Sequence, residues 1–140
     1  MRTAAQLLEA IERVEAADRG AAARELLALA EETLEAWVAA ARGEAPADGE
    51  REGFRLLALH HQGARGIPSF NACRETCREI AYHYNLIGAG EGDGARNVEM
   101  MRLLVRHIAC FVHGKMQVER LGEFCCASKP LRAEADMMEP

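Results

Sequence analysis

The chain has 140 residues, of which 49% are hydrophobic and 28% charged, and a chain of this size and composition buries a single core. Its formal net charge of −5 is the wrong sign for a protein that binds by neutralising phosphates, so we expect no general affinity for nucleic acid. It has no apolar run of about 18 residues and no signal peptide at its N-terminus, so we expect a cytoplasmic protein without a membrane partner.

Apolar residues recur at alternating steps of three and four along most of the chain, which is the period of an amphipathic helix. Helices are predicted over residues 3–17, 21–42, 50–62, 69–87 and 96–123. Thr3 and Ser69 are predicted N-caps, and Gly43 is predicted to end the second helix in a left-handed conformation. Gly114 is predicted to bend or break the fifth helix. Alternating β-branched runs are absent from the sequence, so strands are not expected.

The predicted helix over residues 69–87 is central, because one face of it carries its apolar groups and both of its cysteines. That face consists of Phe70, Cys73, Cys77, Ile80, Tyr84 and Ile87. Short connections force neighbouring helices to run antiparallel. The expected fold is therefore all-α, an antiparallel bundle of four to five helices in a single domain over residues 1–126, followed by a loose C-terminal tail over residues 127–140.

Five cysteines in a chain without an export signal indicate reduced thiols. Cys73 and Cys77 lie about one helical turn apart, so their thiolates could share a soft metal ion or take part in redox chemistry. Core packing is the alternative, because free cysteine behaves as a small hydrophobic side chain. Cys125 and Cys126 are adjacent, and for them a soft-ion site and chance both stay open.

His107, Cys110 and His113 recur every three residues on the predicted fifth helix, away from its main apolar stripe. Three such side chains suggest a second interface, a metal site or the edge of a cofactor site. The outer two are about 9 Å apart along the axis at about 1.5 Å per residue. A metal site would therefore use one adjacent pair and further ligands from another helix, such as His83 or the His60-His61 pair, or from a second subunit. The alternative is a helix packed on two sides, with histidines that are hydrogen-bonded in the interior.

His60 and His61, followed by Gln62-Gly63-Ala64, offer a second hypothesis. This segment resembles the phosphorylation segment of the helical histidine phosphotransfer domains. The resemblance implies a four-helix bundle that carries a phosphorylated histidine at this position, and therefore a phosphotransfer protein.

The spacing from Arg78 to His83 resembles the Arg/His pair of the helical HEPN ribonucleases, and the spacing from Arg102 to His107 repeats it. In such chemistry a cation stabilises phosphate charge while a histidine moves the proton. This resemblance implies a histidine-based enzyme, which together with phosphotransfer forms the alternative function.

We expect an accessory or regulatory protein that acts by binding another protein or as a homodimer, rather than an enzyme. A helix with two apolar sides in a small domain buries one side in its own core and needs a partner to cover the other. The candidate binding surface consists of Leu103, His107, Cys110 and Leu121. A metal- or redox-responsive site would use a transition metal such as zinc. Its candidate ligands are Cys73, Cys77, His83, His107, Cys110 and His113.

Overall fold

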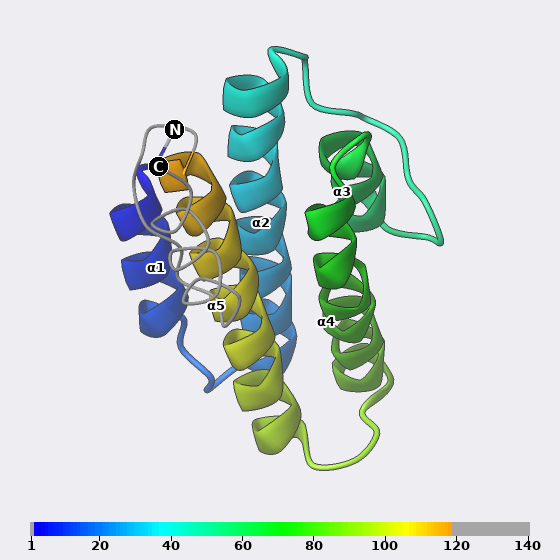
Figure 1. Cartoon of the computed structure of the whole chain (residues 1–140). Coiled ribbons are helices and arrows are strands. Elements are labelled where there is room, and N and C mark those ends of the chain that lie inside the picture. Colours follow the sequence, from blue (N-terminus) through cyan, green and yellow to red (C-terminus); the bar gives the residue numbers. More distant parts are fainter. Residues whose placement is uncertain (1, 119–140) are drawn as a thin grey trace.

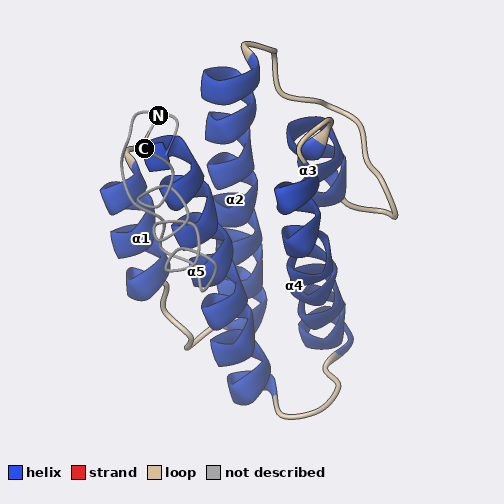
Figure 2. Ribbon diagram, viewed as in Figure 1, coloured by secondary structure: helices blue, strands red, loops and turns tan. Residues whose placement is uncertain are grey.

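The computed structural model describes residues 2–118, which contain five α-helices (Figure 1). They are α1 (Ala4–Arg13), α2 (Arg19–Trp37), α3 (Arg55–Ala64), α4 (Ala72–Ala89) and α5 (Gly94–Val118). A π-helical turn (Val38–Arg42) extends α2, and a 3-10 turn (Pro68–Asn71) precedes α4. No strand occurs within these residues (Figure 2), which confirms the all-α class. The predicted boundary between domain and tail at residues 126 and 127 lies outside the described residues.

The helices α2 and α3 run in the same direction, although most other neighbours in the sequence are antiparallel (Figure 1). The register is set by two contacts: Arg55 pairs with Glu35 at 2.8 Å, and the indole Nε1 of Trp37 donates to the Gly63 carbonyl at 2.9 Å. This arrangement is possible because residues 43–54 are long enough to carry the chain back along the outside of the bundle. The short connections give the expected antiparallel pairs.

The segment over residues 43–54 is held against α3 by hydrogen bonds to the side chain of Gln62. The Gln62 side chain accepts a hydrogen bond from the Ala47 amide at 2.8 Å and donates to the Ala45 carbonyl at 2.9 Å. Arg55 Nε donates to the Ala47 carbonyl at 2.8 Å. These bonds satisfy backbone groups that lack a helical partner, so the segment is a fixed surface loop rather than a domain boundary.

The first helix is shorter than predicted, because its C-terminal carbonyls are bound by a side chain from α5. The guanidinium of Arg102 donates to the carbonyls of Ile11 at 2.6 Å, Glu12 at 3.2 Å and Val14 at 2.8 Å. The helix therefore ends at Arg13 instead of residue 17. Its predicted N-cap is confirmed, since the Thr3 hydroxyl accepts from the Gln6 amide at 3.2 Å.

A tight turn delays the start of α3 from the predicted residue 50 to Arg55. The amide of Arg51 donates to the Phe54 carbonyl at 3.0 Å, and the Phe54 amide donates to the Arg51 carbonyl at 3.1 Å. The two residues between them, Glu52 and Gly53, have φ values of 54° and 85°. By contrast, Gly43 ends the preceding helical turn with φ 63°, as predicted.

Ser69 does not cap α4, because the 3-10 turn places Asn71 at the N-cap position without a side-chain bond. The hydroxyl of Ser69 instead accepts a hydrogen bond from Lys115 Nζ on α5. The helix α5 continues across Gly114 to Val118, so it does not break there, and the bend expected as the alternative stays a prediction. Gly114 is buried in that helix.

The core is centred on an aromatic group contributed by α2, the 3-10 turn before α4, and α5. The ring of Phe70 stacks on Trp37 with centroids 5.0 Å apart and meets Phe111 edge-on at 5.2 Å. Much of the predicted face of the central helix is confirmed as core, with Phe70, Cys73, Cys77 and Ile80 buried. Tyr84 and Ile87 are half-buried. None of the helices within residues 2–118 has the length and apolar character needed to cross a membrane.

Candidate functional site

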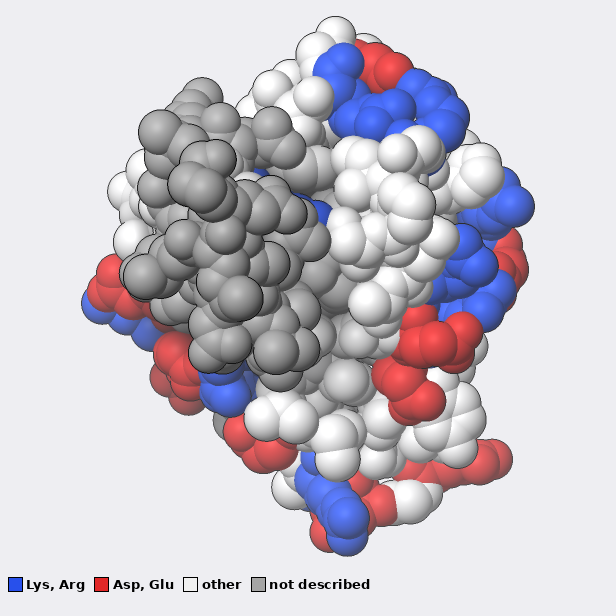
Figure 3. All heavy atoms as spheres, viewed as in Figure 1, with Lys and Arg blue, Asp and Glu red and all other residues white. Residues whose placement is uncertain are grey.

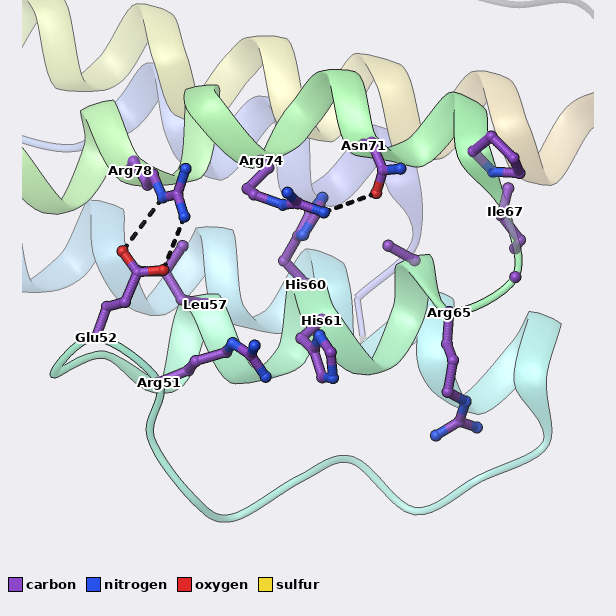
Figure 4. A pocket seen from close by; sticks show the side chains of 13 residues that line it. Arg51, Glu52, Leu57, His60, His61, Arg65, Ile67, Asn71, Arg74 and Arg78 are labelled. Carbon is purple, nitrogen blue, oxygen red and sulfur yellow. Dashed lines mark hydrogen bonds and ion pairs between the residues drawn. The ribbon is translucent and has the colours of Figure 1, made fainter.

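A pocket of about 420 Å³ lies between α3, the turn before it and the beginning of α4 (Figure 4). It is lined by Arg51, Glu52, Leu57, His60, His61, Ala64, Arg65, Gly66, Ile67, Pro68, Asn71, Arg74 and Arg78. We call it the arginine pocket. Its volume is in the range of small-ligand sites, and its wall combines cationic groups with an apolar strip.

Positive charge dominates the arginine pocket in a chain whose net charge is −5. Four guanidinium groups line it against the single carboxylate of Glu52. Figure 3 shows Lys and Arg atoms along the edge of the molecule on the side of α3 and α4, with Asp and Glu atoms beside them. The side chain of Arg51 makes no hydrogen bond or ion pair within residues 2–118, and that of Arg74 bonds only to the neutral amide oxygen of Asn71, at 3.0 Å. Within residues 2–118, neither of these two cations makes an ion pair or hydrogen bond with a carboxylate, and the nearby charge of Glu52 acts on both only at longer range.

The other two arginines are already paired. Arg78 donates through Nε and Nη2 to the two oxygens of Glu52, at 3.2 and 3.0 Å, and through Nη1 to Glu75 at 2.6 Å. Arg65 pairs with Glu44. The hydrogen bond from Arg78 is the main reason that the pKa of Glu52 is lowered, so this carboxylate is ionised at neutral pH. These pairs hold the wall in place.

The two adjacent histidines of α3 have different environments. His60 is buried, and its Nε2 lies 2.9 Å from the Phe70 carbonyl. Because a carbonyl only accepts, Nε2 carries a proton. Burial lowers the pKa of His60, and the bond to Phe70 opposes this effect only in part. His61 is exposed, and Figure 4 shows it on the same side of α3 as Arg51. Of the two, His61 is therefore the one that an incoming phosphoryl group could reach.

We expect the free energy of unfolding to fall as the pH drops below about 6.5, the pKa of an unfolded histidine. The folded state has the lower His60 pKa, so the unfolded state binds more protons in this window, with a slope of at most about 1.4 kcal/mol per pH unit. Urea unfolding at several pH values between 7.5 and 5 would measure this slope. His60→Gln should remove this slope and His61→Gln should keep it; equal slopes in both variants would contradict the assignment.

The sequence pointed to some residues of the arginine pocket but not to their position in one site. It singled out His60, His61 and Arg78 in separate hypotheses and missed Arg51, Arg65 and Arg74. The signal that could have found Arg74 is its spacing of four from Arg78, which puts both on one face of a helix. Arg51 and Arg65 lie outside α3, one before it and one after it, so helical spacing does not relate them to its residues. No sequence pattern therefore points to them.

Cys73 and Cys77 both lie in the core, 2% and 0% exposed. Burial raises the pKa of Cys77, and the neighbouring Cys73 adds to this effect. A raised pKa disfavours the thiolate that metal binding and redox exchange require. Their surroundings therefore favour the core-packing alternative.

The three residues predicted as ligands on α5 are divided between two sides of that helix. His107 is exposed and Cys110 half-buried, and both line a groove beside α4. His113 instead lines a small cavity beside α1. His83 bonds through Nδ1 to the Glu79 carbonyl one turn before it, at 2.8 Å. Within residues 2–118, no three His, Cys, Asp or Glu side chains come together as metal ligands, so the zinc hypothesis remains a prediction that needs ligands from elsewhere.

The predicted binding surface on α5 corresponds in part to that groove. Leu103, His107 and Cys110 line it together with Thr76 of α4, in a volume of about 540 Å³. Leu103 is 52% exposed and is one of two large apolar side chains exposed within residues 2–118, with Tyr82. Leu121 lies outside the described residues. A partner protein or homodimer at this surface remains a prediction.

Within residues 2–118, neither Arg/His pair forms a shared site. Residues five apart on a helix point about 140° away from each other. Arg78 faces the arginine pocket while His83 does not line it. Arg102 is buried against α1, whereas His107 is exposed. The ribonuclease hypothesis therefore gains no support from these positions.

Comparisons of the chain with protein-family models, with curated proteins and with solved structures found no match.

Proposed function

We propose that the protein is a regulatory binding protein, and that its arginine pocket recognises an anionic group of the ligand. One observation carries the proposal: in an acidic chain, four arginines from three segments line one pocket with a single carboxylate. Two of them, Arg51 and Arg74, have no carboxylate partner within residues 2–118. Because neither guanidinium is held in an ion pair, an incoming anion can bind both directly and reduce the repulsion between neighbouring arginines.

The pocket wall also favours an organic ligand over a bare ion. Guanidinium groups bind phosphate and carboxylate oxygens through two parallel hydrogen bonds. Leu57, Ile67 and Pro68 line the same pocket and supply an apolar contact for the rest of the ligand. We therefore expect a small organic anion.

Calorimetry with phenyl phosphate at low ionic strength tests the proposal. The double variant Arg51→Gln/Arg74→Gln should bind roughly 150-fold more weakly, because each of the two lost hydrogen bonds to a charged group contributes about 1.5 kcal/mol. Both side chains are exposed, so the variant should keep its stability. Added salt should weaken binding by the intact chain.

The matched control is Arg24→Gln/Arg96→Gln, which removes the same charge at two exposed positions outside the arginine pocket. This control should bind as tightly as the intact chain, within about threefold. Equal losses in both double variants would show that net charge alone attracts the ligand, and unchanged binding in the pocket variant would place the ligand elsewhere. Either outcome contradicts the proposal.

A further inference from the structure

Glu52 is held at the edge of the arginine pocket by an unfavourable backbone conformation. It occupies the first central position of the tight turn from Arg51 to Phe54, with φ 54°. Within residues 2–118 it is the only residue other than glycine with positive φ. Turns of this kind favour Gly, Asn or Asp at that position, because a longer side chain is strained there. A strained residue beside a pocket points to a function for its side chain.

The Glu52 carboxylate binds Arg78 in the way that an anionic ligand would. Its two oxygens accept from Nε and Nη2 of one guanidinium, at 3.2 and 3.0 Å (Figure 4). The remaining terminal nitrogen of Arg78, Nη1, donates to Glu75. All sides of this arginine that can take a bidentate anion are therefore occupied from within the chain.

We infer that Glu52 is a specificity-determining residue that restricts the arginine pocket to a ligand with one compact anionic group, of the phosphate monoester class. Arg51 and Arg74 provide two positive charges for one dianion, and the exposed His61 adds a donor or acceptor beside them. A second phosphate on the ligand would have to approach Arg78, where it meets the charge of Glu52. The inference rests on the proposed function, because it assigns the ligand class of the same pocket.

The test compares phenyl phosphate with inorganic pyrophosphate by calorimetry on the full chain and on Glu52→Gln. The intact chain should bind phenyl phosphate more tightly. In Glu52→Gln the affinity for pyrophosphate should rise about tenfold, because Arg78 becomes available and the repelling charge is gone, while that for phenyl phosphate should change by less than about threefold. Glutamine keeps the side-chain length, and a urea unfolding curve checks that the variant folds.

Glu75→Gln is the matched control, since it removes the other carboxylate from Arg78 without changing the residues that line the pocket. It should alter neither affinity by more than about threefold. If Glu52→Gln raises both affinities equally, or raises neither, Glu52 does not select the ligand and the inference is overturned while the proposed function stands. If the intact chain and all variants bind neither probe, the proposed function itself is overturned.

Discussion

Replacing Arg102 by methionine is expected to lower the free energy of unfolding by about 3 kcal/mol. The guanidinium is buried and donates to three carbonyls at the end of α1. Methionine fills similar space but donates no hydrogen bond, so these carbonyls lose their partner and α1 loses its attachment to α5. Urea unfolding followed by circular dichroism measures the change.

Arg106→Gln provides the comparison from the next turn of α5. Arg106 pairs with the exposed carboxylate of Glu12, and such surface pairs contribute less than about 1 kcal/mol. Arg102→Lys should fall between the two variants, because an ammonium group keeps the charge but cannot reach three carbonyls with a planar fork. A loss at Arg102→Met no larger than that at Arg106→Gln would show that the carbonyls find other partners.

The contribution of Arg102 explains why the sequence predicted the bundle but misplaced the end of its first helix. Apolar period and capping residues are local signals, and they located five helices and the cap at Thr3 correctly. The bond from Arg102 to Ile11 joins residues that are 91 positions apart. No local pattern reports such a contact, and the isolated segment from residue 3 to 17 has a continuous helical period.

The arginine pocket could not be predicted from the sequence either, because it too is formed by residues that are distant along the chain. It depends on the parallel course of α2 and α3, which brings the segment carrying Arg51 back beside α4. A short connection would have placed Arg51 at the other end of the bundle. Histidines are candidate site residues by their type alone. Exposed arginines are not, because charged side chains are common on every protein surface.

The same register between α2 and α3 leaves no room for a side chain at Gly63. A Cβ atom built there would lie 2.7 Å from Cδ1 and 3.2 Å from Nε1 of Trp37. Alanine in a helix interior is otherwise more favourable than glycine by about 1 kcal/mol. Overpacking a buried site costs about 1–3 kcal/mol, and the bond from Trp37 to the Gly63 carbonyl would stretch as well. Gly63→Ala should therefore destabilise the protein by about 1–2 kcal/mol.

Gly88 provides the matched control, because the same substitution there meets no atom within 4 Å and the residue lies in α4. Gly88→Ala should stabilise the protein by about 0.5–1 kcal/mol, since the unfolded chain loses conformational freedom and nothing in the folded state resists. The two variants are thus expected to shift the urea midpoint in opposite directions. A stabilising Gly63→Ala would show that Trp37 moves aside at little cost, and that the close approach of α2 and α3 does not depend on the missing side chain.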